Sequence, residues 1–144
     1  MAIPSHLALE IVTPDRSIVH ETVDEVEIPG SEGYLGVLPG HTPLLTMLQV
    51  GELWFRRGEE RFYLSLAFGF AEILPDRVRI LAQMAERAEE IDIARAEAAE
   101  RRARERLASP VVDIDFERAR IAMMKSLTRL QVASKGRVRG QAGL

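Results

Sequence analysis

Glycine, proline and histidine gather in one stretch of the chain, residues 30–45, which reads GSEGYLGVLPGHTPLL. Glycine-rich loops can bind phosphates, and a histidine held in a rigid turn can serve as an acid or a base. These glycines follow neither the GxGxxG nor the GxxxxGK[ST] spacing, so a phosphate-binding loop is not expected. Pro39, Gly40 and Pro43 instead predict a rigid, irregular turn that fixes His41. From the pattern alone, the favoured expectation is that His41 hydrogen-bonds its own loop.

The remaining residues that could do chemistry are scattered. His6, His20 and His41 are the three histidines, and no nucleophile elbow, HExxH motif or P-loop accompanies them. Cysteine is absent, which excludes disulfides and thiolate metal sites. We therefore expect no catalytic residues, no metal site and no required cofactor.

Charge is unevenly divided along the chain. Residues 1–84 hold 6 Arg and no Lys against 12 acidic residues, whereas residues 85–144 hold 13 basic residues against 10 acidic ones. This division indicates two units with different partners. A nucleic-acid partner is not expected, because the net charge is −3 and every Trp and Tyr lies in the first unit. The N-terminus is a poor signal peptide and no apolar run approaches about 20 residues, so we expect a soluble protein, or one peripheral to a membrane.

Alternating apolar residues predict strands over residues 5–84. LALEIV at 7–12 and DEVEIP at 24–29 alternate, and residues 52–66 and 70–82 each predict a hairpin, with turns at Gly58 and at Pro75-Asp76. Such short strands, separated by Gly and Pro, indicate a β-sandwich or a barrel.

After Met84 the composition changes to Ala, Glu and Arg, which favours helix. Asp92 is the expected N-cap of a first helix that Ser109-Pro110 ends, and Asp113 or Asp115 caps a second. The expected fold is α+β by content: an all-β sandwich over residues 1–85, an antiparallel two-helix hairpin over 86–135 and a disordered tail over 136–144.

Each predicted helix has one apolar stripe, and the two stripes are expected to face each other. The stripe of the first helix contains Ala96, Ala99, Ala103 and Leu107, and that of the second contains Phe116, Ala119, Met123, Leu127 and Leu130. Arg118, Lys125 and Arg129 share the opposite face of the second helix and form a basic stripe that is expected to point outward. Alanine faces bury little area, so the hairpin either changes its packing or is simply a small stable unit.

Four segments resemble the epsilon subunits of bacterial F-type ATP synthases, called delta in mitochondria. They are LEIVTPDR at 9–16, GSEGYLGVLPGHTPLLT at 30–46, EEIDIARAEAA at 89–99 and DIDFERA at 113–119. The GxLPGHxPLL element is the most specific of them. The resemblance covers about residues 5–135 and follows the expected order of strands before helices.

The resemblance implies a ten-stranded sandwich and a helical hairpin in a non-catalytic subunit of the central stalk. It implies that the sandwich contacts the gamma subunit and the c-ring, with Tyr34, Pro39, Gly40 and His41 at this interface. Many relatives have an acidic or polar residue where this chain has Tyr34. The subunit would help to couple proton-driven rotation of the c-ring to ATP synthesis. It would reach the cytoplasmic side of the bacterial inner membrane only through the complex.

The resemblance also assigns a regulatory role to the hairpin, which would inhibit ATP hydrolysis when it extends towards the catalytic beta and alpha subunits. The basic stripe would then meet acidic surfaces of those subunits. Some members bind ATP as a regulatory ligand through an I/L-D-x-x-R-A motif. The matching residues here are Ile91, Asp92, Arg95 and Ala96, with supporting positions at Glu86, Arg102, Arg106 and Arg118. Alternatively, Asp92 is only a helix cap and the arginines pair with neighbouring glutamates.

Two other functions stay open at this point. The chain could be a free-standing β-sandwich interaction module with a helical arm, or a small ATP sensor that acts alone. Binding to gamma and c subunits would separate the first of these from a stalk subunit, and calorimetry with ATP would test the second.

Overall fold

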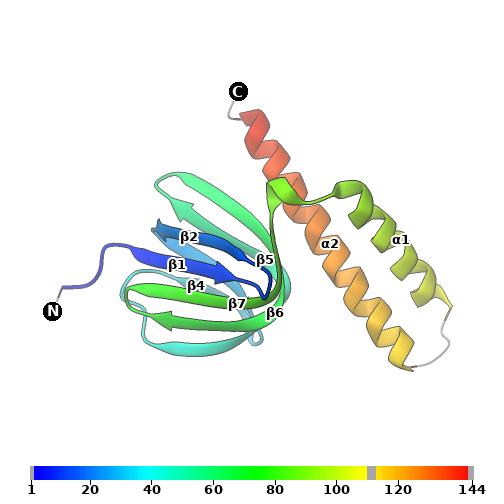
Figure 1. The fold of residues 1–144 in the computed structure, drawn as a ribbon, viewed down its shortest axis with the longest axis horizontal. Coiled ribbons are helices and arrows are strands. Elements are labelled where there is room, and N and C mark those ends of the chain that lie inside the picture. The colour runs from blue at the N-terminus through cyan, green and yellow to red at the C-terminus, as the bar shows by residue number, and fades with distance from the viewer. Residues whose placement is uncertain (1, 110–112, 143–144) are drawn as a thin grey trace.

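The computed structural model describes residues 2–109 and 113–142, which form seven strands followed by helices (Figure 1). Its strands are β1 Leu7–Val12, β2 Ser17–Val23, β3 Glu25–Gly30, β4 Gly33–Val37, β5 Leu44–Arg57, β6 Glu60–Leu74 and β7 Arg77–Arg87. The predicted strands at 7–12 and 24–29 and the predicted turns at Gly58 and Pro75-Asp76 are confirmed. No helix in these ranges is long and apolar enough to cross a membrane.

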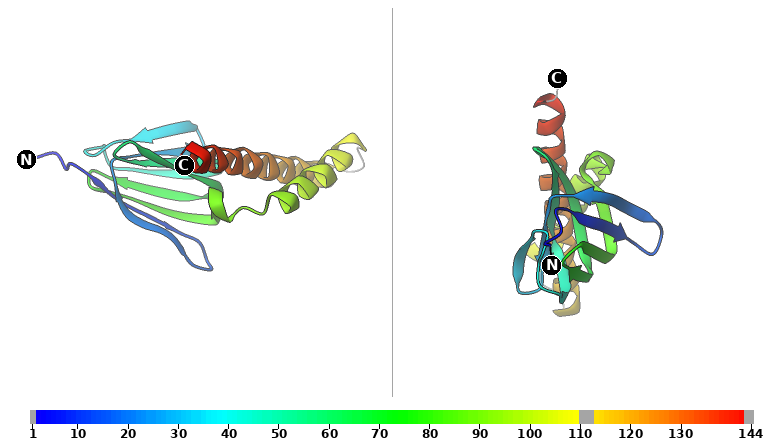
Figure 2. Two further views of the ribbon diagram at one scale, coloured as in Figure 1. Left: turned by 90° about the horizontal axis from the view of Figure 1, so that it is seen from above. Right: turned by 90° about the vertical axis from the view of Figure 1, so that its left-hand side faces the viewer.

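All seven strands belong to one hydrogen-bonded sheet in the order β2-β1-β7-β6-β5-β3-β4. Only the β1–β7 pairing is parallel. Phe68 of β6 has φ of 62° and interrupts the pairing with both β5 and β7, although the register is the same on either side of it. The sheet curves over itself as a β-sandwich, as Figures 1 and 2 show.

The resemblance implied ten strands, and the structure has seven. The difference follows from three long strands, β5, β6 and β7, which span 14, 15 and 11 residues. The pairing of β3 with β5 shifts register between Glu27 and Gly30. An irregularity of this kind re-aims a strand without ending it, so one long strand can contribute to both layers of a sandwich. The enclosed core consists of inward-facing aliphatic residues and the stacked rings of Phe55 and Phe62, whose centroids are 4.9 Å apart.

Two α-helices follow the sandwich and form the predicted antiparallel hairpin. A short 3-10 helix, η1 (Ala88–Glu90), leads into α1 (Ile93–Ala108), and α2 (Asp113–Ala142) returns past η1. The Asp92 carboxylate accepts a hydrogen bond from the Arg95 backbone N–H at 3.1 Å, which confirms the predicted N-cap. Pro110, the predicted break, lies outside the described residues. In Figure 2 the hairpin extends away from the end of the sandwich where the N-terminus lies.

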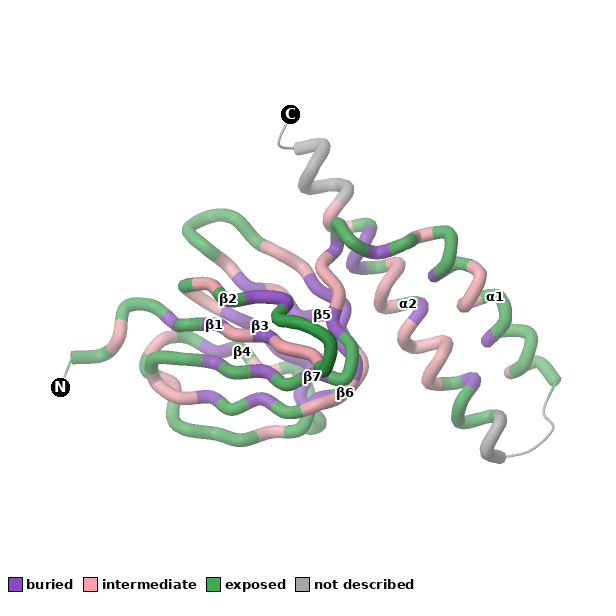
Figure 3. Tube along the Cα trace, in the orientation of Figure 1, coloured by how far each residue is buried: buried purple, intermediate pink, exposed green. Residues whose placement is uncertain are grey.

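The predicted apolar stripe of α2 is partly wrong. Ala119, Ser126 and Ala133 are buried at heptad spacing, whereas Phe116 and Leu127 are each 45% exposed. Figure 3 shows that buried and exposed positions are interleaved along α2. The buried face is therefore rotated from the predicted one. The reason is tertiary: α2 packs against β5, β6 and η1 as well as against α1, and small residues permit that close approach.

The tail predicted as disordered over 136–144 is helical as far as Ala142, and residues 143–144 lie outside the description. Glycine disfavours helix, which was the basis of that prediction. Gly136 is retained in the helix because it packs against η1. A Cβ atom at this position would lie only 2.7 Å from the Ala88 Cβ.

Candidate docking surfaces

A patch of apolar side chains is exposed on the outer face of the sheet. Leu45 of β5, Phe70 of β6 and Leu81 of β7 are 71%, 49% and 51% exposed, and together with Glu72 and Arg79 they line a hollow of about 300 Å³. Met47 extends the patch, because it pairs across the strands with Phe70, which in turn pairs with Leu81. We call these four residues, Leu45, Met47, Phe70 and Leu81, the apolar patch. An exposed cluster of this kind on a sheet is typical of a protein-binding surface.

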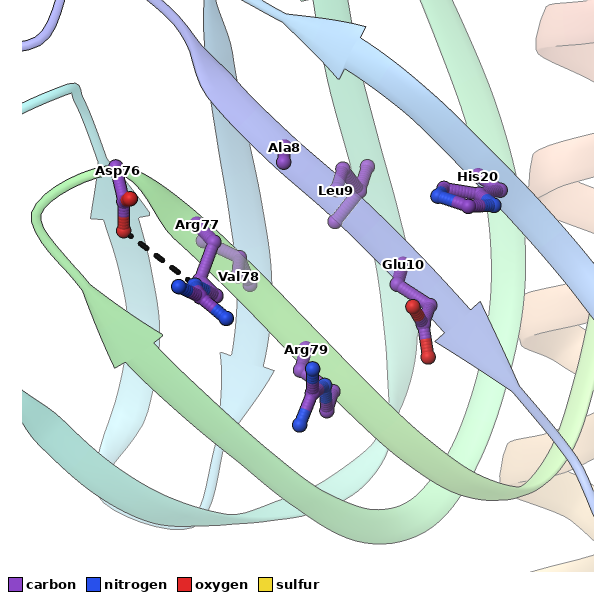
Figure 4. Close-up of a pocket in the computed structure, with 8 residues that line it drawn as sticks. All are labelled: Ala8, Leu9, Glu10, His20, Asp76, Arg77, Val78 and Arg79. Carbon is purple, nitrogen blue, oxygen red and sulfur yellow. Dashed lines mark hydrogen bonds and ion pairs between the residues drawn. The ribbon is translucent and has the colours of Figure 1, made fainter.

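Charged residues border the apolar patch on the same sheet. Glu10 of β1 pairs across the strands with His20 of β2 on one side and with Arg79 of β7 on the other, and Arg79 pairs with Glu72. Figure 4 shows Glu10, His20, Arg77 and Arg79 around a second hollow of about 300 Å³, with the Arg77–Asp76 ion pair at 3.4 Å. An apolar centre with a charged rim is the usual anatomy of a protein interface. Within the described ranges, no group of His, Asp and Glu could hold a metal ion.

The Pro39-Gly40-His41 loop joins β4 to β5 and is fixed by backbone contacts. Gly40 has φ of +89°, a conformation that favours glycine, and its N–H donates to the Pro75 carbonyl at 2.7 Å. The Nδ1 atom of His41 lies 2.6 Å from the Thr42 carbonyl oxygen, which confirms the expectation that His41 bonds to its own loop. The loop is therefore rigid, and His41 is held beside the exposed Leu38.

Tyr34 lies on the edge strand β4 and is 60% exposed. Its hydroxyl accepts a hydrogen bond from the Glu52 backbone N–H at 3.3 Å, so the side chain reaches from β4 to β5. The ring therefore has a fixed orientation and an exposed face. This arrangement allows contact with another protein without further ordering of the side chain.

The residues matched to an ATP site divide between the two ends of the hairpin. Ile91, Asp92, Arg95 and Ala96 lie where α1 begins, near Glu86 at the end of β7. Arg102 and Arg106 are exposed farther along α1, and at 1.5 Å per residue Arg106 is about 21 Å beyond Asp92 along the helix axis. Arg118 is exposed near the start of α2. It is eleven residues, or about 16 Å along the helix axis, from Arg129, which contacts Glu86.

Glu86 instead contacts Arg129, a residue that the sequence analysis placed only in the basic stripe. Nη2 of Arg129 donates to Oε2 of Glu86 at 3.2 Å, and Nε lies 2.8 Å from Oε1 in an orientation unsuited to a hydrogen bond. Lys125 lies over the Phe68 ring at 5.7 Å from its centroid. The expectation that the basic stripe points outward is therefore wrong for Lys125 and Arg129, which face the sandwich. Arg118 is exposed.

The apolar patch was not predicted from the sequence, although a signal was present. In a half-buried strand every second residue is polar, and Phe70 and Leu81 break that alternation by placing large apolar side chains at outward positions. The Glu86–Arg129 pair gave no such signal in the sequence, because the partners are 43 residues apart. They meet because α2 turns a different face towards the sandwich than the one predicted.

Two family models match adjoining parts of the chain. Residues 6–88 match the ATP synthase, Delta/Epsilon chain, beta-sandwich domain, and residues 89–134 match the ATP synthase, Delta/Epsilon chain, long alpha-helix domain. The ATP synthase epsilon chain of Solibacter usitatus is 47% identical over 132 residues, which is 92% of this chain and 98% of that protein. That of Koribacter versatilis is 56% identical over 98 residues, covering 68% and 69% of the two chains.

Solved structures show the same architecture. A chain in the cryo-EM structure of the Euglena gracilis mitochondrial ATP synthase (OSCP/F1/c-ring, rotational state 1) superposes with a TM-score of 0.79 at 27% identity and covers 89% of this chain and 81% of that one. A chain of the Tetrahymena thermophila mitochondrial ATP synthase central stalk and c-ring has a TM-score of 0.54 at 14% identity, with 94% and 98% covered, which shows likeness of fold.

Proposed function

Since the chain belongs to the ATP synthase delta/epsilon chain family, we propose that it couples rotation of the c-ring to ATP synthesis within the central stalk and restrains ATP hydrolysis. It is a non-catalytic subunit of ATP synthase. We propose that it acts on the cytoplasmic side of the bacterial inner membrane, which it would reach through the complex. The sandwich and the hairpin have separate tasks in this proposal.

The sandwich is proposed to bind the gamma subunit through the apolar patch. The observation that carries this proposal is the exposed row Met47, Phe70 and Leu81 with Leu45 beside it, bordered by Glu72 and Arg79. Burial of such a row would provide most of the adhesion, and the charged rim would fix the orientation. The rigid loop at Pro39, Gly40 and His41, together with Tyr34, is proposed to add contacts to gamma and the c-ring.

The hairpin is proposed to inhibit ATP hydrolysis after it leaves the sandwich. In the structure Arg129 contacts Glu86, and Lys125 lies over the Phe68 ring. Both side chains could therefore contact acidic surfaces of the catalytic beta and alpha subunits only after the hairpin has left the sandwich. The docked hairpin would therefore be the non-inhibitory form. A ligand could shift this equilibrium only by binding the two forms unequally.

ATP is proposed as that regulatory ligand, bound near the start of α1. Arg95 and Arg129 offer guanidinium groups for phosphates, and a guanidinium can bind phosphate without a glycine-rich loop. The placement of Arg102, Arg106 and Arg118 removes them from a compact site that includes Glu86 and Asp92. Calorimetry on the full chain with ATP, repeated with Arg95→Gln, tests this site: heat released on binding should be lost in the variant.

The gamma contact can be tested by pull-down of the full chain with the gamma subunit. The double variant Phe70→Ser, Leu81→Gln should lose most binding, because it removes apolar area from the centre of the patch. A matched control is Phe116→Ser, Leu127→Gln, which changes two exposed apolar residues on α2 and should bind like the wild type. Equal binding by both double variants would show that gamma uses a different surface. Thermal melting of each variant checks that the sandwich is folded.

A further inference from the structure

Gly136, in the last part of α2, makes a close contact with the chain that precedes the hairpin. Gly136 packs against Ala88 of η1 so tightly that an added Cβ would lie 2.7 Å from the Ala88 Cβ, while the next atoms of Ala88 would lie at 3.7 Å and 3.8 Å. Glycine in the interior of a helix weakens that helix relative to alanine. The glycine therefore favours the docked arrangement at the expense of the helix itself.

Charged and aromatic contacts lie directly beside the contact of Gly136 with Ala88. Nζ of Lys135 donates to Oε2 of Glu52 on β5 at 2.8 Å and lies 5.2 Å from the centroid of the Tyr63 ring on β6. This distance is within the range of a cation–π interaction. One turn earlier, Val132 and Ala133 are buried in a small cluster with Ala88 and Ile91.

We propose that Glu52, Tyr63, Ala88, Lys135 and Gly136 form a clasp that holds the hairpin on the sandwich, and that Gly136 sets the fraction of molecules in the docked form. The regulatory meaning of the clasp rests on the proposed function, but the docking equilibrium belongs to the chain itself. The clasp lies at the far end of α2 from the hairpin turn. Release at residues 132–136 would leave α2 held on the sandwich by weaker contacts nearer the hairpin turn, such as those of Arg129 with Glu86 and of Lys125 with Phe68.

The clasp is suited to reversible docking. Its apolar contacts come mostly from small side chains, which contribute little area. The second oxygen of Glu52, Oε1, is buried without a hydrogen-bond partner among the described residues, and it would regain water on release. Both features keep the docked form from being greatly favoured over the released one.

Alanine at position 136 would destabilise the docked form and stabilise the released form, so both effects favour release. In the docked form its Cβ would clash with Ala88, whose Cβ is attached to the backbone of η1 and cannot rotate away. In the released form it would stabilise the helix. Gly136→Ala should therefore lower the ratio of docked to released molecules by roughly fivefold to thirtyfold.

Distance measurement on the full chain tests the clasp directly. The sequence has no cysteine, so Glu59→Cys on the exposed β5–β6 turn and Arg101→Cys on the exposed side of α1 provide two unique sites for spin labels. Pulsed electron paramagnetic resonance should give mainly one narrow distribution for the otherwise wild-type chain, at the shorter distance of the docked form. Gly136→Ala should add a broad population at longer distances.

Three further variants separate the contact of Gly136 with Ala88 from general effects on the helix. Ser134→Ala raises helix propensity at an exposed position of the same turn and should leave the distances unchanged. Ala88→Gly combined with Gly136→Ala leaves only the ordinary contacts at 3.7 Å and 3.8 Å, and it should restore the short distance. Lys135→Gln, which keeps the glycine, should also increase the long-distance population.

Three results would overturn the proposal: unchanged distances in Gly136→Ala, no restoration by Ala88→Gly, or long distances already dominant in the parent chain. Circular dichroism confirms that α2 stays helical in each variant. The outcome is independent of the proposed inhibition, which is measured as ATP hydrolysis in the assembled enzyme. A clasp that works in the isolated chain would stand even if the hairpin did not inhibit.

Discussion

The carboxylate of Glu86, at the end of the last strand, lies 2.8 Å from the guanidinium of Arg129 in the middle of α2. The two side chains are 25% and 17% exposed, so this ion pair is better shielded from water than a surface pair. Arg129 also belongs to the basic stripe that we propose contacts the catalytic subunits. It must therefore leave Glu86 before it can contact another subunit, so in the proposed function one residue takes part in both docking and inhibition.

The Glu86–Arg129 pair should contribute measurably to docking of the hairpin. We expect Glu86→Gln and Arg129→Gln to show a coupling of about 1 kcal/mol in a double-mutant cycle on the docked fraction, since the pair is partly shielded. The exposed Glu117–Arg120 pair within α2 is a matched control and should show little effect on docking. Additive effects of the two Glu86 and Arg129 changes would mean that the pair contributes nothing to docking.

Arg118 offers a cleaner test of the inhibitory stripe than Arg129 does. Removal of residues 89–144 should raise ATP hydrolysis by the assembled enzyme, and Arg118→Gln should reproduce part of that rise, because this side chain is exposed in the docked form. Arg129→Gln weakens both the docked form and the stripe, so its net effect should be smaller. The effect of Arg118→Gln should also weaken with salt, as for exposed charges generally. Unchanged hydrolysis after the truncation would contradict an inhibitory hairpin.

Local features of the fold could be predicted from the sequence because they depend on neighbouring residues. Strand β1 was predicted from the alternation of Leu7, Leu9 and Ile11, and the start of α1 from the capping preference of Asp92. The hairpin followed from two helical segments with a break between them. In each of these cases, residues within one or two turns determine the local structure.

Features that depend on distant contacts could not be predicted in this way. Helical periodicity favoured Phe116 and Leu127 as buried residues, but the face that α2 buries is set by its simultaneous contact with α1 and the sandwich. Glycine content favoured a disordered tail, but contact with Ala88 retains Gly136 in the helix. Among the candidate site residues, His41 was predicted correctly in its loop bond, whereas the arginines of the ATP set were grouped without knowing how far apart the helices place them.

The sandwich should fold without the hairpin. Among the described residues, its core cluster includes none from α1 or α2, and the small cluster at Ile91, Val132 and Ala133 is separate from it. Residues 1–88 should therefore melt in one cooperative transition and still bind the gamma subunit. Differential scanning calorimetry and pull-down measure these two properties. A broad transition without a heat-absorption peak would show that α2 is needed to complete the sandwich.

Asp24 should stabilise the sandwich only above acidic pH. Its carboxylate accepts a hydrogen bond from the Gly58 N–H at 2.7 Å and contacts Nδ1 of His6 at 2.8 Å, and these two contacts lower its pKa below the usual 3.8. The stabilisation is fully present above pH 3.8 and is lost as the pH falls through the lower folded-state value. Asp24→Asn should thus unfold at lower urea concentration than the wild type at pH 7, and the difference should shrink below pH 3.8. A difference that is the same at both pH values would mean that ionisation of Asp24 has no part in it.

Gly40 should be required for the stability of the loop before β5. Its φ of +89° lies in the region that side chains with a Cβ rarely adopt, so Gly40→Ala should lower the free energy of unfolding by about 1–2 kcal/mol. The predicted 2.7 Å contact with Cγ2 of Ile3 should add little, since Ile3 is an exposed side chain near the N-terminus and can move aside. Gly36→Ala is the matched control: it adds the same methyl group on β4, with nothing within 4 Å and no positive φ. Urea unfolding should separate the two variants clearly, and equal midpoints would show that the backbone conformation at Gly40 carries no penalty for alanine. Because the change strains the loop that holds His41, Gly40→Ala should also weaken binding to the gamma subunit, whereas Gly36→Ala should leave it unchanged.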